Sequence, residues 1–291
     1  MTLFNFPASS DPGPDFALLL RRTGHPLGVQ PTEAAGGAPG GGSSPGVGPA
    51  WPTIGGGPSG PGLEIRHGTT IVALRYADGV VMAGDRRATE GHAIAHRRIE
   101  KVFPADRHSG IAIAGAAGPA VEMVRLFQTQ LEHYEKVEGM ALSLEGKANQ
   151  LGQMIRGNLA MAMQGLVVVP LLGGFDTKRG KGRIFTYDVT GGRYEEADLH
   201  ATGSGGRDAR TTIKLGYREA MTGAEAISLA IKGLYEAADE DSATGGPDVI
   251  RGIYPSVATI TESGFERVDE EEVAEYFQSL IRSKSEEPSA P

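Results

Sequence analysis

The chain has 291 residues, which is enough for one large domain or two small ones, and 40% of them are hydrophobic. Its formal net charge is −8 and it has no dense basic cluster, so nucleic acid is not an expected partner. It contains no cysteine. This excludes disulfides, thiolate metal sites and cysteine nucleophiles, and it suits a reducing compartment.

Membrane and export signals are not predicted. No apolar run approaches the roughly 20 residues that a spanning helix needs. The N-terminal apolar run, Phe16 to Leu20, is short, has no basic region before it, and is followed by Arg21 and Arg22, so it fits neither a signal peptide nor a twin-arginine signal. We therefore expect a cytoplasmic protein without a membrane partner.

The composition changes abruptly after Gly68. Eleven of the 18 prolines precede residue 62, and nearly all of residues 31–62 are Gly, Pro, Ala or Ser. Such a segment buries too little apolar surface to offset its ordering entropy, so we expect it to be disordered. Composition alone favours a flexible linker. Residues 1–30 hold little that a linker could connect, however, so a removable leader is the alternative.

Regular structure is predicted from Thr69 onward. TTIVALRY (69–76) and GVVMAGD (79–85) are apolar nearly throughout, as strands buried on both faces are. The Ala77-Asp78-Gly79 segment between them predicts a hairpin, because Asp-Gly tolerates positive φ. A second strand pair is expected around residues 92–102 and 109–114.

Helices and strands then alternate in groups. Apolar residues at helical spacing predict one helix around 121–134 and another over 144–163. The remaining predictions are strands at 166–175, 183–188, 194–201 and 256–261, helices at 207–218, 224–239 and 268–281, and a loose tail from Ser283. This order predicts an α+β protein with two antiparallel sheets packed together and covered by helix pairs on the outside, that is, an αββα sandwich.

The first hairpin brings Thr69 close to Asp85. Threonine at a strand start is ordinarily structural, and Asp85 and Lys101 also have ordinary structural explanations. If the bond after Gly68 were cut, however, Thr69 would carry both a hydroxyl and an α-amine. That amine, with a pKa of about 7.7 to 8.0, can act as base for its own hydroxyl. A nearby Lys101 would lower the pKa of the amine, and Asp85 would hold the lysine.

These residues resemble a known family. The stretch TTIVALRYADGVVMAGDRRAT, followed by Lys101, IAIAGAAG and Gly203-Ser204-Gly205, resembles proteasome β-subunits, and AADEDSATGG (237–246) with the Gly-rich leader points to the actinobacterial type. The resemblance covers essentially residues 69–281. It implies the N-terminal-nucleophile hydrolase fold and a threonine endopeptidase that degrades unfolded polypeptides inside a barrel.

The resemblance also implies site residues and domains. By position Thr69 matches the nucleophile and Lys101 the essential lysine, and Gly68–Thr69 is the bond cut during autocatalytic maturation. The other matches are Asp85 as the acid, Ser204, Asp241, Thr244 and Gly245 near the amine, and Gly115 for the oxyanion. Thr244 stands where the family has serine. The implied domains are a leader of residues 1–68, a catalytic domain of residues 69–282 and a tail of residues 283–291.

An apolar substrate pocket is implied beside the nucleophile, which predicts cleavage after apolar or aromatic residues. Its expected lining is Ala88, Ile99, Phe103, Ile113, Ala117 and Val121. The same residues could instead belong to the core. Gly115 could instead be present only because a strand packs closely on a helix there. Residues 203–208 form at most a weak phosphate-loop match, and residues 241–246 could be a simple helix exit.

The expected partners follow from the resemblance. They are proteasome α-subunits, other copies of the chain in seven-membered β-rings, an ATP-dependent unfoldase ring acting through the α-ring, and unfolded polypeptides. No cofactor or metal is expected, because the histidines lack ligand spacing. Two alternatives stay open: an asparaginase-type amidase that exposes its threonine by autocleavage, and a non-catalytic ring scaffold subunit.

Overall fold

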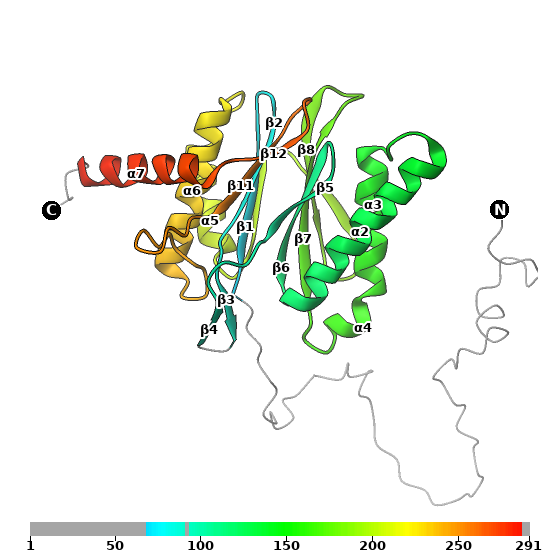
Figure 1. Ribbon diagram of the computed structural model, residues 1–291, viewed down its shortest axis with the longest axis horizontal. Helices are drawn as coiled ribbons and strands as arrows, with labels where there is room; N and C mark the ends of the chain where they lie inside the picture. Colours follow the sequence, from blue (N-terminus) through cyan, green and yellow to red (C-terminus); the bar gives the residue numbers. More distant parts are fainter. Residues whose placement is uncertain (1–67, 91–92, 287–291) are drawn as a thin grey trace, which may run out of the picture. The chain divides into compact units, whose positions relative to one another are not determined.

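The computed structural model describes residues 68–90 and 93–286, which form an α+β sandwich of four layers (Figure 1). Two sheets lie in the middle, with α2, α3 and α4 beside one and α5, α6 and α7 beside the other. Apart from Gly68, the predicted leader lies outside the described residues, as do residues 287–291. The predicted fold class is confirmed.

The first sheet is five-stranded, antiparallel, and ordered β10-β1-β2-β11-β12. Its strands are β1 (Thr70–Tyr76), β2 (Gly79–Gly84), β10 (Leu199–Gly203), β11 (Ser256–Ile260) and β12 (Phe265–Arg267). The register pairs Thr70 with Gly203 and Ile71 with Gly84. The start of β1, the end of β2 and the end of β10 therefore meet at one end of the sheet.

The second sheet is also five-stranded and antiparallel, ordered β5-β6-β7-β8-β9. Its strands are β5 (Val102–Asp106), β6 (Ser109–Gly115), β7 (Val168–Asp176), β8 (Lys181–Tyr187) and β9 (Arg193–Glu196). A separate two-stranded ribbon joins β3 (Ala88–Glu90) to β4 (Ala93–His96).

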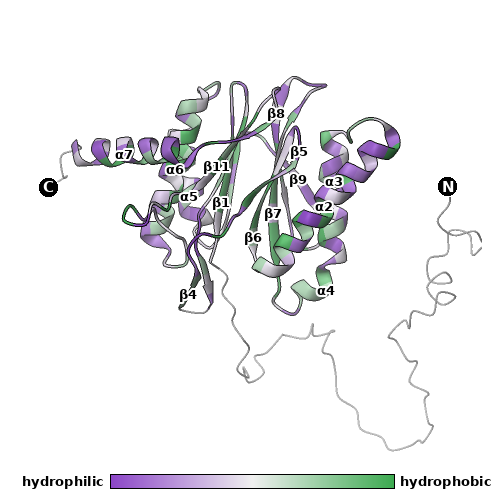
Figure 2. Cartoon of the chain, in the orientation of Figure 1, coloured by the Kyte–Doolittle hydropathy of each residue, from purple (hydrophilic) through white to green (hydrophobic). Residues whose placement is uncertain are grey.

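The helices are amphipathic and cover the outer sheet faces. They are α2 (Ala117–Glu138), α3 (Leu144–Gly157), the short α4 (Leu159–Ala162), α5 (Gly206–Gly216), α6 (Gly223–Glu240) and α7 (Glu270–Glu286). A capping box at Thr222, whose hydroxyl and backbone N–H both bond to Glu225, fixes the start of α6. Figure 2 shows hydrophobic colouring along β6 and β7 and hydrophilic colouring along much of α7.

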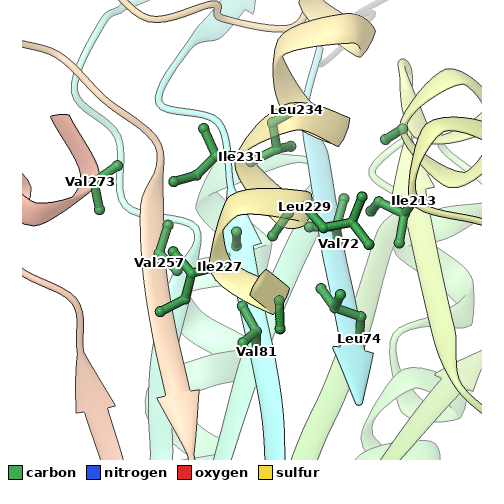
Figure 3. Close-up of a cluster of buried hydrophobic side chains, with 14 of the residues drawn as sticks. Val72, Leu74, Val81, Ile213, Ile227, Leu229, Ile231, Leu234, Val257 and Val273 are labelled. Carbon is green, nitrogen blue, oxygen red and sulfur yellow. The ribbon is translucent and has the colours of Figure 1, made fainter. Parts of the chain in front are cut away.

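Three buried clusters fill the spaces between the layers. Along β1, Val72 and Leu74 face α5 and α6, whereas Ile71 and Ala73 face the other sheet, because successive strand side chains point to opposite faces. Figure 3 shows the first of these clusters, in which side chains of α6 such as Ile231 lie over β1 and β2. Each fully buried Ile or Leu contributes about 1.5–3 kcal/mol. Both sheets are thus buried on both faces, which explains their apolar sequences.

The segment predicted as one strand over 194–201 is two strands in different sheets. β9 pairs with β8 in the second sheet, and β10 pairs with β1 in the first. The chain bends at Ala197 and Asp198, where Arg75 holds it through a backbone bond from its N–H to the Asp198 carbonyl at 2.8 Å. The sequence of residues 194–201 does not reveal that the chain changes sheets, because the residues before and after the bend each have the pattern of a regular strand.

Three other expectations need correction. The helix predicted over 144–163 is interrupted at Asn158, whose φ of −89° and ψ of 2° lie outside the helical region, after the poor helix former Gly157. The strand expected over residues 92–102 is not one strand: β4 pairs with β3, and only Lys101 and Val102, at the start of β5, meet β6. The last helix extends to Glu286, so the predicted loose tail from Ser283 is helical as far as it is described.

The first hairpin forms as predicted, but for another reason. The turn residues are Ala77 and Asp78, and neither Asp78 nor Gly79 has positive φ. Glycine is needed at 79 because a Cβ there would lie 2.0 Å from the carbonyl oxygen of Ile260 in neighbouring β11. Close strand approach, not turn conformation, selects this glycine.

Candidate active site

The predicted catalytic residues gather at one end of the two sheets. Thr69 directly precedes β1, Asp85 follows β2, Lys101 precedes β5, and Ser204 follows β10. The segment Asp241–Gly245, which follows α6, closes the group. Each residue lies at an element end, so the sheet register sets their separations.

Asp85 is completely buried and binds four donors. Its Oδ1 accepts the Lys101 ammonium at 2.6 Å and the Thr70 N–H at 2.8 Å. Its Oδ2 accepts the backbone N–H groups of Arg87 and Gly245, both at 2.9 Å. With all these acceptor positions filled, the carboxylate holds three chain segments and the lysine in fixed positions.

Lys101 is 3% exposed and makes a second bond, 2.6 Å to the carbonyl oxygen of Arg87. Burial lowers the pKa of its ammonium below the ordinary value, and the carboxylate of Asp85 only partly opposes this shift. A lysine with a lowered pKa can take part in proton transfer more readily than an exposed one.

Thr69 lies beside the peptide bond that the sequence marks for cleavage. Its hydroxyl donates to the Gly68 carbonyl oxygen at 2.7 Å, and the Gly68 N–H donates to Thr89 Oγ1 at 3.1 Å. A Cβ at position 68 would lie 2.1 Å from Ala243 Cβ and 2.5 Å from its carbonyl oxygen. Only glycine fits before Thr69 in this arrangement.

A group of hydroxyls and one carboxylate surrounds the Thr69 nitrogen. The Thr69 N–H donates to Ser204 Oγ at 3.2 Å, and the Ser204 N–H donates to the Thr69 carbonyl at 2.8 Å. The Thr244 hydroxyl donates to Asp241 Oδ2 at 2.6 Å. Burial raises the pKa of Asp241, but hydrogen bonds from Ser204 and Thr244 outweigh that effect and leave the pKa lowered. Thr244, in the place of serine, keeps the hydroxyl contact.

Gly115 ends β6 next to the site. Its φ is +102°, and a Cβ would lie 2.1 Å from the carbonyl oxygen of Val167. Both observations require glycine here, so close packing is one reason for this residue. Helix α2 starts immediately beyond it, at Ala117.

A small pocket opens beside Thr69, and most of the predicted lining is present. Five of the six predicted residues line it: Ala88, Ile99, Ile113, Ala117 and Val121. Phe103 does not; it packs against the cluster under α2 and α3, since alternation along β5 turns it to the opposite sheet face from Val102. Glu100 and Lys101 also line the pocket, so the lining is less uniformly apolar than predicted.

Sequence reasoning missed three contributors. Thr70 bonds to Thr244 and Gly205 within the hydroxyl group around Asp241. Arg87 donates to the carbonyls of Ser242 and Thr244, at 3.0 and 3.2 Å. Glu100 reaches the pocket. The repeated threonine after Gly68 and the arginine next to the Asp85 motif were the available signals, but their contacts are with residues far along the chain.

Within residues 68–90 and 93–286, no group of three or more His, Asp or Glu side chains is arranged to hold a metal ion. In the same described part of the chain, no helix has both the length and the apolar character required to cross a membrane.

Comparison with known proteins agrees with the fold. The family model described as "Proteasome subunit" matches residues 65–251. The chain is 58% identical to a proteasome subunit beta of Acidimicrobium ferrooxidans over 282 residues, which cover 96% of this chain and 94% of that protein. It is also 58% identical to a proteasome subunit beta of Streptomyces griseus over 229 residues, or 79% of this chain and 82% of that protein.

The fold and these similarities define a class of protein, the subunits of a protease. The chain belongs to the proteasome subunit family. Its similarity to two β-subunits over most of its length supports a catalytic β-subunit that assembles with other subunits into a proteasome core, as the sequence predicted. The asparaginase-type alternative is thereby set aside.

Proposed function

We propose that the chain is a threonine endopeptidase whose nucleophile is the Thr69 hydroxyl, exposed when the chain cuts its own Gly68–Thr69 bond. The observation that carries the proposal is the position of Thr69: its hydroxyl is 2.7 Å from the Gly68 carbonyl oxygen, next to the buried Lys101–Asp85 pair and an open pocket. Residues 1–68 are the leader, and residues 69–282 form the catalytic domain.

The first reaction removes the leader. Thr69 Oγ attacks the Gly68 carbonyl carbon while Lys101, acting through a water molecule, takes the hydroxyl proton. The C–N bond breaks as the nitrogen gains a proton, which leaves the leader attached to Thr69 as an ester. Water then hydrolyses the ester, releases the leader with a carboxylate at Gly68, and leaves Thr69 with a free hydroxyl and a free α-amine.

The second reaction is the repeated one. The α-amine takes the hydroxyl proton as Thr69 Oγ attacks a substrate carbonyl, and the proton then passes to the leaving amine. A second water hydrolyses the acyl-enzyme. Lys101 is held in place by Asp85 and lowers the pKa of the α-amine by like-charge repulsion. Ser204, Asp241 and Thr244 orient the amine, and the Gly115 N–H stabilises the oxyanion.

The pocket and the assembly determine which chains are cut. The apolar lining around Ile113 and Val121 favours cleavage after apolar residues. Substrates are unfolded polypeptides that enter a barrel in the cytoplasm, formed by copies of this chain in seven-membered β-rings and by α-subunits, with an ATP-dependent unfoldase ring acting through the α-ring. Compartmentalisation keeps an unspecific nucleophile away from folded cellular proteins.

N-terminal sequencing and intact-mass measurement of the assembled particle test the proposal. The expected mature sequence is Thr-Thr-Ile-Val, starting at Thr69. A different mature start overturns the nucleophile assignment, because the base mechanism needs the amine on Thr69. Size-exclusion chromatography with peptidase assays, with and without an α-subunit, should place activity in the large assembly. Full activity at monomer mass would exclude the barrel.

A further inference from the structure

Thr70 is completely buried beside the site and is not part of the two reactions above. Its backbone N–H donates to Asp85 Oδ1 at 2.8 Å. Its side-chain oxygen accepts the Gly205 N–H at 3.0 Å and lies 2.6 Å from Thr244 Oγ1. Strand propensity explains a threonine here, but it does not explain a hydroxyl with two polar partners from distant segments.

The direction of these hydrogen bonds follows from proton counting. The hydrogen bonds of Asp241 lower its pKa, so its carboxylate is ionised at neutral pH and only accepts. Thr244 has one hydroxyl proton and donates it to Asp241 Oδ2 at 2.6 Å. The 2.6 Å contact between the two threonines must therefore use the proton of Thr70.

The Thr70 hydroxyl also contacts the segment that carries Ser204. Its oxygen accepts the N–H of Gly205, the residue next to Ser204, at 3.0 Å. The Thr69 N–H donates to Ser204 Oγ at 3.2 Å, and the Ser204 hydroxyl donates to the Thr69 carbonyl oxygen at 3.4 Å. Thr70 therefore joins Thr244 to the Ser204–Gly205 segment, and that segment contacts the Thr69 nitrogen.

We propose that Thr70 is a positioning residue for the nucleophile: its hydroxyl holds Thr244 and the Gly205 N–H in place, so that the adjacent Ser204 presents a lone pair to the Thr69 nitrogen. This rests on the proposed function of Thr69 and adds a residue to it. In the mature chain, the bond to Ser204 uses one N–H of the amine and directs the amine lone pair at the Thr69 hydroxyl. The second threonine after Gly68 therefore acts on the rate of the chemical step without touching substrate.

Three variants separate the hydroxyl from the methyl group. Thr70→Val keeps the shape and removes the hydroxyl, Thr70→Ser keeps the hydroxyl, and Thr70→Ala removes both. In the assembled particle, with the mature start verified by intact mass, we expect kcat of Thr70→Val to fall roughly tenfold with KM unchanged. Thr70→Ser should stay within about threefold of the parent. Thr186→Val, the same change at a buried strand position of the other sheet, is the control and should leave kcat unchanged.

Each outcome decides the proposal. An unchanged kcat in Thr70→Val overturns it, as does an equal loss in the serine and alanine variants, which would show that the methyl group is what matters. If Thr70→Val does not assemble, a lower kcat in Thr70→Ala than in Thr70→Ser supports the proposal. Thr69→Ala is measured in parallel. If this variant stays active, the assignment of Thr69 as nucleophile fails. If it is inactive and the Thr70 variants keep the kcat of the parent, only the role of Thr70 is overturned.

Discussion

Among the described residues, two Lys–Asp pairs have similarly buried lysines but different surroundings: the carboxylate of Asp85 is fully buried, and that of Asp106 is 15% exposed. Lys101 is 3% exposed and lies 2.6 Å from Asp85, while Lys147 is 4% exposed and lies 2.5 Å from Asp106. Lys147 reaches from α3 to the turn between β5 and β6, where Asp106 also accepts the Ser109 hydroxyl at 2.6 Å. This second group joins a helix to a sheet.

The comparison shows that a buried lysine, a carboxylate and a hydroxyl do not by themselves make a catalytic site. Around Lys101, Asp85 is saturated by backbone donors, and the lysine lines a pocket that Thr69 shares. Around Asp106, the hydroxyl donates to the carboxylate instead of lying next to a peptide carbonyl. The neighbours of the pair decide whether it performs chemistry or stabilises the fold.

The largest expected effect is at Thr69, which has no counterpart in the second pair. Thr69→Ala should reduce peptidase activity at least about a thousandfold and leave the leader attached, because the hydroxyl is lost while the fold is kept. Fluorogenic peptide assays and intact mass measure both effects. Thr69→Ser is the control and should retain partial activity; an active alanine variant would place the chemistry elsewhere.

Replacing each lysine by methionine tests the comparison directly. In particles whose leader has been removed beforehand, Lys101→Met should lower kcat about a hundredfold or more, because the Thr69 α-amine loses the neighbouring positive charge that lowers its pKa. Lys147→Met should lower the free energy of unfolding by roughly 3 kcal/mol, because the largely buried Asp106 carboxylate loses its partner, and leave kcat of the folded particle near normal. Urea unfolding and steady-state kinetics on both variants give the answer, and a reversed pattern contradicts the assignment.

Lys101→Arg sharpens the role of the first pair. The guanidinium keeps the charge, but it is larger and planar and cannot give up the proton that leader removal requires. With the leader removed beforehand, we therefore expect turnover little above that of Lys101→Met. Peptidase assays on particles with a verified mature start measure this. Near-normal turnover would mean that charge alone is sufficient.

A further difference between the two pairs is that only Lys101 lines a pocket. Replacing a pocket residue should affect activity less than replacing Lys101. Ile113→Ala enlarges the pocket and should shift kcat/KM toward larger apolar residues before the cleaved bond by roughly tenfold. Phe103→Leu should leave the preference within about twofold, since Phe103 packs under the helices. Assays with leucine, phenylalanine and tryptophan substrates distinguish the two. An equal shift in both variants would indicate that Phe103 lines the pocket after all.

The smallest effect is on the pH dependence of stability. Burial lowers the pKa of Lys101 below its ordinary 10.5, so between the lowered pKa and about 10.5 the unfolded state binds the proton and the folded state does not. Lys101 therefore makes stability rise with pH across that window. Subtracting the unfolding free energies of Lys101→Met from those of the parent, over a pH series, should reveal the rise; a flat difference would contradict the shift.

The sequence alone determined most helices and strands and the proximity of Thr69 to Asp85. Apolar periodicity located nearly all strands and helices, because it reflects the face that each element buries. Thr69 and Asp85 were predictable as neighbours because a short turn joins β1 to β2, whereas Lys101, next to β5 of the other sheet, was assigned from the family resemblance.

Only the tertiary structure decided how Ser204 and Thr244 join the site. The bond from Thr69 to Ser204 joins residues 135 positions apart, and the contact from Thr70 to Thr244 joins residues 174 positions apart. Ser204 reaches Thr69 only because the chain changes sheets after β9, and Gly68 is restricted by Ala243 of a distant loop. Periodicity records whether a residue is buried but not which residue it meets, since long-range partners are set by how the layers pack.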